Sequence, residues 1–313
     1  MPNRREFVKA ATVIGAASLA TAAQEIPKRT LGKTGLKVSI LGLGGARIGN
    51  LPDEKQAVDV VRKCYDMGVN YFDCASAGAY GLSQTRYGAA LKGLRDKVVL
   101  GTKTRHRTAT QAQLDLDQSL ANLRTDYLDL YQIHNVINDE DIEFIFGPKG
   151  VMEMVEKAKK EGKVRFVGLT GHTTPEVLNR AIAKYDFATV LMPLSVTDGG
   201  NSQKSFEKVT LPLARKRNMG IIAMKTFGAG QILQKKAATE KECLHYVWTL
   251  PVSTAIAGCQ QIAHVETCVS LAQTSRPMTA MEMDGLRRRF ADAQWASIEP
   301  WKAPAEVSEY RAD

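Results

Sequence analysis

Four side chains of this sequence could together carry out acid–base chemistry on a carbonyl group. Asp73, Lys103 and His134 each follow a short apolar run, and a tyrosine, Tyr80, comes soon after the first of them. A phenol is a weak acid at neutral pH, but a nearby ammonium lowers its pKa and a carboxylate can position that ammonium. We therefore expect Tyr80 to act as acid or base, tuned by Lys103, which pairs with Asp73. An imidazole such as His134 can bond the carbonyl oxygen and orient it.

The segments before these residues are typical of β-strands, because they are short, rich in β-branched or aromatic residues and separated by segments of helical length. Alternating strands and helices predict a parallel sheet, in which the carboxyl ends of the strands can bring distant side chains together. Eight such strands are expected, at 40–44, 69–72, 98–102, 128–133, 165–170, 188–192, 221–225 and 254–257. The predicted fold class is therefore an α/β protein, a (β/α)8 TIM barrel with an N-terminal β-hairpin at 30–39 and an extra C-terminal helix at 281–293.

The first 23 residues resemble an export signal. Arg4 and Arg5 precede Phe7 and Lys9, an apolar stretch follows, and the segment ends in Ala-Thr-Ala-Ala. The pattern predicts a twin-arginine signal peptide over residues 1–23, recognised by the twin-arginine export machinery. Its apolar run is shorter than the roughly 20 residues that span a bilayer, so no stable membrane span is expected. We predict an exported, periplasmic protein with one barrel domain over residues 24–313.

Charge and cysteine usage narrow the class of protein. The chain of 313 residues carries a formal charge of +9, spread along its helices, and nothing in it resembles a nucleic-acid-binding module. Its five cysteines are odd in number and never form a Cys-x-x-Cys pair, so we expect neither a metal site nor a complete disulfide framework. Arg105-His106-Arg107 follows Lys103 and is expected either to contact substrate or phosphate, or to form a solvated loop.

The order and spacing of these motifs resemble the aldo-keto reductase family from residue 28 to about residue 269. Within the family the chain is most similar to exported bacterial members. The supporting segments are 72–75 (Phe-Asp-Cys-Ala), 80–84 (Tyr-Gly-Leu-Ser-Gln), 102–104 (Thr-Lys-Thr), 126–130 (Asp-Tyr-Leu-Asp-Leu) leading to His134, 168–172 (Gly-Leu-Thr-Gly-His), 192–194 (Met-Pro-Leu) and 224–225 (Met-Lys). The resemblance implies an NAD(P)(H)-dependent oxidoreductase in which Asp73, Tyr80, Lys103 and His134 are catalytic.

Tyr80 departs from the spacing of that family. The family tyrosine usually follows the aspartate by about five residues, a position that Gly78 occupies here. Two alignments are possible. Either a short insertion within 76–79 has shifted the motif so that Tyr80 is the family tyrosine, or glycine has replaced the tyrosine.

The resemblance also implies a cofactor, NADP, with NAD as the alternative. The positions that correspond to its binding residues are Thr170, Gly171, His172, Lys225, Phe227, Gly228, Ala229, Gly230, Gly258, Cys259, Gln260 and His264. The glycines of 228–230 would let backbone amides approach phosphate. Leu191 and Met224 replace the glutamine and tyrosine that usually contact the nicotinamide, and segment 260–268 has no arginine or lysine for a 2′-phosphate. The preference for NADP is thus taken from the family alone.

Three functions remain open from the sequence. The first is reversible hydride transfer to a small-molecule carbonyl or sugar, and the second is sugar-ring oxidation or epimerisation with the same residues. The third is a catalytically degenerate module that only binds a dinucleotide. Export further suggests that the cofactor stays bound and is recycled between two substrates. Candidates for the substrate wall are Phe144, Phe146, Asp198, Trp295 and Trp301, and the sequence does not indicate the substrate or the oligomeric state.

Overall fold

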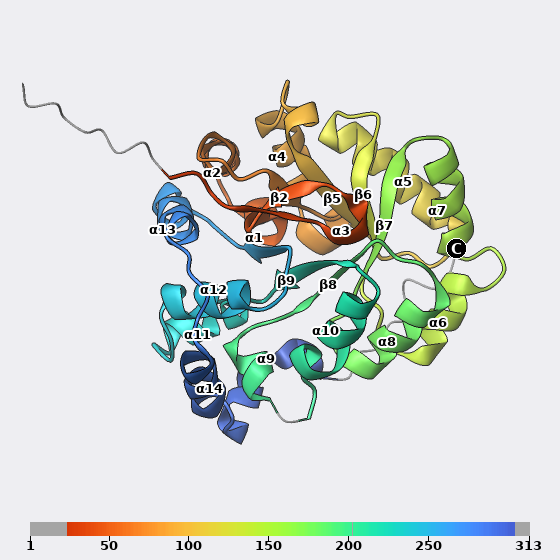
Figure 1. Ribbon diagram of the computed structural model, residues 1–313. Coiled ribbons are helices and arrows are strands. Elements are labelled where there is room, and N and C mark those ends of the chain that lie inside the picture. Colours follow the sequence, from red (N-terminus) through yellow and green to blue (C-terminus); the bar gives the residue numbers. More distant parts are fainter. Residues whose placement is uncertain (1–23, 202, 304–313) are drawn as a thin grey trace, which may run out of the picture.

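The computed structural model describes residues 24–201 and 203–303. Within them, eight parallel strands close into a barrel in the order β3-β4-β5-β6-β7-β8-β9-β10, and β10 pairs back with β3 through Ala255 and Leu41 (Figure 1). The predicted TIM barrel is confirmed. The predicted signal peptide at 1–23 lies outside the described residues, so export stays a prediction.

All eight barrel strands begin and end within two residues of their predicted limits, and two match them fully, because each apolar run ends where the chain turns outward. The strand β5 is the instructive difference, since it continues through Lys103 to Thr104 and keeps that lysine inside the sheet. The barrel strands are β3 Leu41–Gly44, β4 Tyr71–Asp73, β5 Val99–Thr104, β6 Leu128–Ile133, β7 Val164–Thr170, β8 Thr189–Pro193, β9 Gly220–Met224 and β10 Thr254–Ala257.

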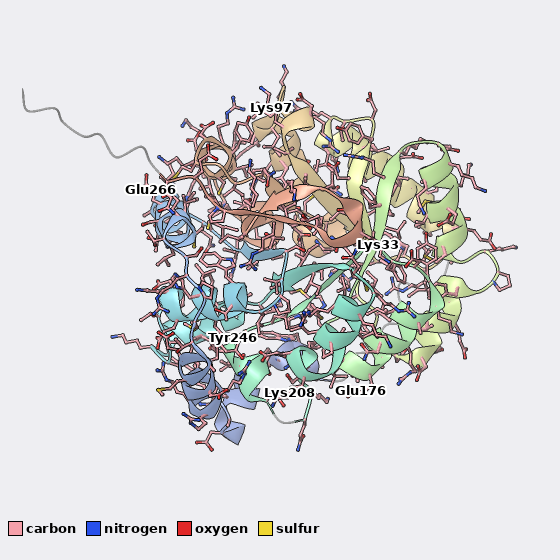
Figure 2. All side chains as sticks on the ribbon, viewed as in Figure 1. Lys33, Lys97, Glu176, Lys208, Tyr246 and Glu266 are labelled. Atoms are coloured by element: carbon pink, nitrogen blue, oxygen red, sulfur yellow. The ribbon has the colours of Figure 1, made fainter. Side chains whose placement is uncertain are left out.

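Helices surround the barrel, and charged side chains such as Lys97, Glu176 and Glu266 point outward from them (Figure 2). Side-chain caps start several helices: Asp53 accepts a hydrogen bond from the amide of Gln56 at the start of α2. The helices are α1 Gly45–Gly49, α2 Glu54–Asp66, α3 Ala77–Tyr80, α4 Ser83–Ala90, α5 Ala109–Leu123, α6 Asp139–Phe146, α7 Val151–Lys160, α8 Pro175–Lys184, α9 Val196–Gly200, α10 Phe206–Lys216, α11 Gln231–Gln234, α12 Glu240–Thr249, α13 Ile262–Gln273 and α14 Ala280–Arg289. Within the described residues, no helix has the length and apolarity needed to cross a bilayer.

The predicted hairpin, formed by β1 (Lys28–Thr30) and β2 (Lys37–Ser39), covers the end of the barrel where the strands begin. Its fully buried Leu31 joins the small apolar cluster inside the barrel with Tyr71 and Leu191. Gly32 has φ +50°, and a Cβ there would lie 2.1 Å from the amide nitrogen of Gly220. Only glycine fits this close approach, which seats the hairpin against the start of β9.

The predicted C-terminal helix is α14, which ends at Arg289, four residues before its predicted limit. Two 3-10 turns follow, at Ala293–Ile298 and Pro300–Lys302. The second turn is anchored by a buried ion cluster, in which the Lys302 ammonium bonds Asp198 at 2.7 Å and Glu299 at 2.8 Å. This cluster fixes the C-terminal segment against α9.

Candidate active site and dinucleotide groove

The strand-end residues Asp73, Lys103 and Gln132 form one buried hydrogen-bonded group. The Lys103 ammonium bonds the Asp73 carboxylate at 2.5 Å and the Cys74 carbonyl at 2.7 Å. The Gln132 amide donates to the other carboxylate oxygen of Asp73 at 3.3 Å. The three side chains come together because β4, β5 and β6 are adjacent, with Lys103 opposite Gln132 in the register. All three are fully buried.

The buried pair determines the protonation of the group. Burial lowers the pKa of Lys103, but the charges of Asp73 and Tyr80 more than compensate, so that its pKa lies above the usual value. Burial also raises the pKa of Asp73, against the opposing effect of Lys103 and Gln132. Lys103 therefore stays an ammonium, with its charge directed at both the carboxylate and the tyrosine.

Tyr80, the last residue of α3, lies beside this group. The Lys103 ammonium is 4.8 Å from the centroid of its ring, and the His134 ring centroid is 6.1 Å away in an edge-to-face arrangement. Burial raises the pKa of Tyr80, and the charge of Lys103 with a hydrogen bond to it opposes that rise. Tyr80 thus lies beside Lys103 and His134, whereas a Cβ at Gly78 would meet no atom within 4 Å.

Two glycines make this position of Tyr80 possible. Gly81 follows it with φ +54° and ψ −130°, a conformation that other residues rarely adopt. A Cβ on Gly49, at the end of α1, would lie 1.6 Å from the Tyr80 carbonyl oxygen. The Leu82 amide then donates to the Gly49 carbonyl at 3.1 Å. The loop after β4 is therefore packed closely on the loop after β3.

Two neutral imidazoles face each other beyond Tyr80. The rings of His134 and His172 have centroids 5.6 Å apart. Burial lowers the pKa of His134 well below its usual value, helped by the charges of His172 and Lys103. Burial and the charge of Lys225 lower the pKa of His172 to about 3. His172, predicted to bind the cofactor, therefore lies next to the predicted carbonyl-orienting histidine.

A groove with a volume of about 490 Å³ begins at Asp73 and Tyr80 and extends across the ends of β9 and β10. Ligand pockets commonly have volumes of this order. Eight of the residues predicted to bind the cofactor line it: Lys225, Phe227, Ala229, Gly230, Gly258, Cys259, Gln260 and His264. Asp73 and Tyr80 of the predicted acid–base group and most of the predicted cofactor residues therefore line a single cavity, whose lining does not include Lys103 or His134.

Other predicted cofactor residues lie outside the lining of this groove. Thr170 is fully buried, and its hydroxyl has no hydrogen-bond partner among the described residues. Gly171 is also buried, at the end of β7. Gly228 supports the groove indirectly, because its φ of +57° starts the 3-10 turn Gly228–Gly230.

Two charged residues of the groove, Arg47 and Glu240, were not predicted from the sequence. Arg47 donates to the Ala229 carbonyl at 3.1 Å, and a Cβ on Gly258 would lie 2.9 Å from its Cγ. Arg47 thus crosses from the loop after β3 to the turn after β9, and its place just beyond a strand end could have indicated it. Glu240 begins α12, and no sequence signal distinguishes it from other acidic residues at helix starts.

Lys225 supplies a second cation to the groove. Among the described residues no carboxylate forms an ion pair with it, and its ammonium lies 5.1 Å from the ring centroid of Trp301. Burial and the charge of Arg47 lower the pKa of Lys225. Trp301, one of the predicted wall residues, therefore contacts a residue of the groove.

Several residues that were predicted to contact a ligand have structural roles instead. Arg107 is buried and forms a two-point ion pair with Asp141, at 2.6 and 2.9 Å, so the expectation of a ligand contact or solvated loop is wrong for this residue. Asp198 belongs to the ion cluster of Lys302. Phe146 packs against Phe187, with ring centroids 6.3 Å apart.

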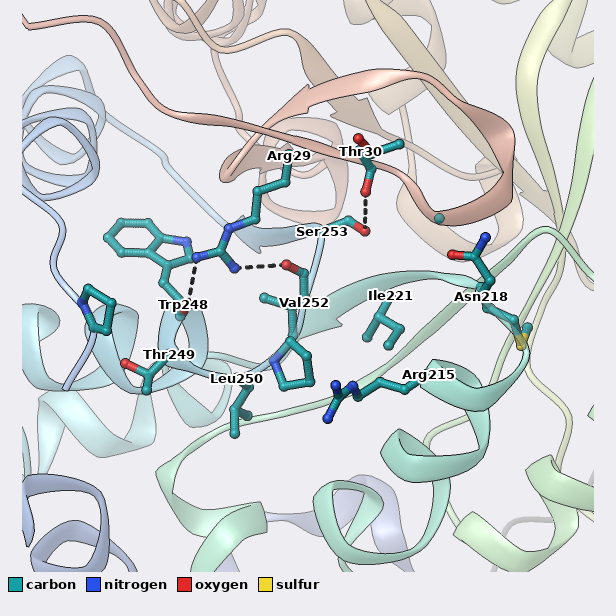
Figure 3. Close-up of a pocket in the computed structure, with 14 residues that line it drawn as sticks. Arg29, Thr30, Arg215, Asn218, Ile221, Trp248, Thr249, Leu250, Val252 and Ser253 are labelled. Atoms are coloured by element: carbon teal, nitrogen blue, oxygen red, sulfur yellow. Dashed lines mark hydrogen bonds between the residues drawn. The ribbon is translucent and has the colours of Figure 1, made fainter. Parts of the chain in front are cut away.

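A second cavity, of about 520 Å³, lies under the hairpin at the opposite end of the barrel. Figure 3 shows Arg29 directed toward Val252 and Trp248, whose carbonyl oxygens accept its hydrogen bonds at 2.8 and 2.7 Å. The guanidinium thus ties the hairpin to the end of α12. None of the predicted site residues lines this cavity.

Comparison with known proteins agrees with this geometry. The model of the aldo/keto reductase family matches residues 40–280. L-galactose dehydrogenase of Arabidopsis thaliana is 30% identical over 226 residues, covering 67% of this chain and 68% of that protein. The aldo-keto reductase YhdN of Bacillus subtilis is 29% identical over 204 residues, covering 59% and 57%. The solved holo form of an aldo-keto reductase from Bacillus halodurans superposes with a TM-score of 0.70 at 24% identity, over 92% of this chain and 100% of that one.

Proposed function

Because the chain belongs to the aldo/keto reductase family, we propose that it is an oxidoreductase that interconverts a carbonyl and an alcohol with a nicotinamide dinucleotide, and that Tyr80 is its acid or base. One observation carries this proposal: the Lys103 ammonium contacts both Asp73 and Tyr80 at the end of a groove lined by the expected cofactor residues. The proposal extends to the roles of the individual residues and to the cofactor.

The residues of the groove fit a nicotinamide dinucleotide. The turn Gly228–Gly230 can present backbone amides to phosphate, and Arg47 and Lys225 are cations without a carboxylate partner among the described residues. The unpartnered buried hydroxyl of Thr170 is suited to an amide group. When bound, the dinucleotide would supply or accept the hydride.

The proton is moved by this chain's own side chains. In reduction, the Tyr80 hydroxyl would donate its proton to the carbonyl oxygen, and the Lys103 ammonium would stabilise the phenolate that remains. Asp73 holds that ammonium in place. His134, neutral because its pKa is far below the usual value, would orient the carbonyl by hydrogen bonding without competing for the proton. In oxidation the same groups act in reverse.

The proposed substrate is a small molecule with a carbonyl or alcohol group, with sugars as one candidate class. The relative from Arabidopsis thaliana is named as a dehydrogenase of L-galactose, which supports sugars as substrates. Sugar-ring oxidation or epimerisation would use the same four residues.

Export through the twin-arginine route is also part of the proposal. Free dinucleotide is scarce outside the cytoplasm, so the cofactor would remain bound and pass hydride between two substrates in turn. Protein recovered from the exported fraction should then release a dinucleotide on denaturation. Absence of a releasable dinucleotide would contradict retention.

The enzyme proposal is tested with purified protein. We expect NADH or NADPH fluorescence to change on binding and one member of a panel of aldehydes, ketones and sugars to be turned over. Tyr80→Phe should lower kcat by at least about 100-fold, since it removes the proton donor, with dinucleotide binding retained. Tyr127→Phe is the matched control, because that tyrosine packs on Arg95 away from the groove. Dinucleotide binding with no turnover of any substrate would favour the degenerate binding module, whereas unchanged kcat in Tyr80→Phe would remove Tyr80 from the mechanism.

A further inference from the structure

The lining residues of the groove determine how a bound dinucleotide would be oriented in it. Tyr80 and Asp73 line one end, and hydride transfer requires the nicotinamide to lie there. The cations Arg47 and Lys225 flank the middle, beside the turn Gly228–Gly230, and suit the diphosphate. The adenosine must therefore lie at the far end, which is formed by the start of α12 and by the segment from Gly258 into α13.

The far end carries no cationic side chain. Its polar lining residues are Glu240, Gln260, His264 and Thr267, and Arg47 and Lys225 are the only lysine or arginine residues among the described residues that line the groove. The guanidinium of Arg47 is bonded to the Ala229 carbonyl, on the side of the glycine turn. A 2′-phosphate at the far end would thus meet a carboxylate and no ammonium or guanidinium.

Glu240 is available to bind a ligand there. It is exposed, and among the described residues no lysine or arginine forms an ion pair with it. Thr239 and Glu242 cap the N-terminus of α12 in a capping box. The Glu240 carboxylate is therefore not needed for capping this helix. Thr267 and Cys268 of α13 line the same groove as Glu240, and α12 packs beside α13.

We infer that this groove selects NAD(H) over NADP(H), and that Glu240 is the residue that determines the choice. A carboxylate accepts hydrogen bonds from the hydroxyls of an unphosphorylated ribose and repels a phosphate on the same ribose. The amides at the start of α13 would attract a phosphate, but this attraction is weaker than a full opposing charge at short range. This inference rests on the proposed dinucleotide-dependent function and reverses the family expectation of NADP.

Binding of the two reduced dinucleotides to the full-length chain tests the inference. Dissociation constants for NADH and NADPH are measured by nicotinamide fluorescence at low salt. We expect NADH to bind at least about tenfold more tightly than NADPH in the wild type. Glu240→Gln should narrow that ratio mainly by improving NADPH binding, and Glu240→Lys should favour NADPH. Glu266→Gln is the control, because it removes the same charge from α13 at a residue paired with Lys63 at 3.1 Å and outside the groove lining.

The outcomes separate the two proposals. A wild type that binds NADPH as tightly as NADH or more tightly, or a ratio that Glu240→Gln leaves unchanged, overturns the role of Glu240 and leaves the oxidoreductase proposal intact. Equal changes of the NADH-to-NADPH affinity ratio in Glu240→Gln and Glu266→Gln would also overturn this role. The loss of one negative charge anywhere near the groove would then explain the effect. A wild type that binds neither dinucleotide overturns the proposed function together with this inference.

Discussion

The ammonium of Lys103 lies 4.8 Å from the ring centroid of Tyr80 while it bonds Asp73 at 2.5 Å. One ammonium group therefore contacts two partners, a carboxylate from β4 and a tyrosine from α3. The carboxylate keeps the lysine protonated, and the protonated lysine favours the phenolate form of the tyrosine. The stability of the barrel and the acidity of Tyr80 are linked through this one residue.

Replacing Lys103 by methionine should affect both properties. Asp73 would be left as a buried carboxylate without its cation, so we expect a loss of about 3–5 kcal/mol in the free energy of unfolding. The pKa of Tyr80 would rise further, because burial would no longer be opposed by the Lys103 charge. Alcohol oxidation, which needs the phenolate, should therefore reach its plateau at a higher pH than in the wild type. Urea unfolding and a pH profile of kcat measure the two effects.

The double variant Lys103→Met/Asp73→Asn is the control for the stability effect. It removes both charges, so its loss in unfolding free energy should be smaller than that of Lys103→Met alone. Its pH profile should still be shifted upward, since Tyr80 again lacks the ammonium. Additive losses for the two single substitutions would show that the pair is not energetically coupled.

The glycines near Tyr80 provide a second prediction. Gly81→Ala should place a residue with a Cβ at φ +54°, 2.9 Å from the Gly49 carbonyl oxygen. We expect a cost of roughly 1–2 kcal/mol and a fall in kcat, because the loop that holds Tyr80 must move. Gly78→Ala is the matched control: its Cβ would meet no atom within 4 Å, and the change should stabilise the chain by about 0.4–1 kcal/mol. Loss of activity in Gly78→Ala would mean that position 78, rather than Tyr80, determines the site.

These residues also show how far the sequence could predict the site. Asp73, Lys103 and His134 were identifiable because each closes a strand, and parallel strands of a barrel bring their ends together. Tyr80 was also a candidate, but the sequence left two alignments open for it, because its position depends on Gly81 and on the close approach of Gly49, which no local pattern reveals. Strand periodicity therefore predicts positions in the sheet, while loop conformation depends on contacts between distant segments.

The charged residues of the groove also could be predicted only in part from the sequence. The predicted cofactor residues mostly come from strand ends and glycine turns, whose chemistry is visible in the sequence. Glu240 lies at the start of α12, and the packing of that helix beside α13 brings it to the groove. In the same way, Arg107 looked accessible in sequence, but its ion pair with Asp141 buries it. Pairing of charges across the fold decides which ones remain available to a ligand.

The buried imidazole of His172 should make stability depend on pH. Its pKa is lowered from its usual value of 6.5 to about 3, so the unfolded chain binds a proton at this residue more readily than the folded chain does between these values. Stability should therefore decrease as pH falls from 6.5 toward 3, and the contribution is fully present above 6.5. His172→Gln should show a shallower decrease in Tm over pH 6.5 to 4. At pH 8 the imidazole is neutral in both the folded and the unfolded chain, so a difference in Tm between wild type and variant at this pH reflects packing alone. Parallel curves for wild type and variant would contradict this linkage.

The ion cluster of the C-terminal segment gives a prediction with the opposite dependence on pH. Lys302→Met would leave Asp198 and Glu299 as neighbouring buried carboxylates, at a cost of about 3–5 kcal/mol at pH 8. Burial already raises the pKa of Glu299 and Lys302 opposes that rise, so the variant should bind a proton at Glu299 more readily when folded than when unfolded. Its stability deficit should then be smaller at pH 5 than at pH 8, as measured by urea unfolding. Lys208→Met, at an exposed lysine that only bonds the Asn201 carbonyl, is the control and should change little at either pH. An equal deficit at both values would show that packing of the lysine stem, rather than its charge, holds the segment and its Trp301 against the barrel.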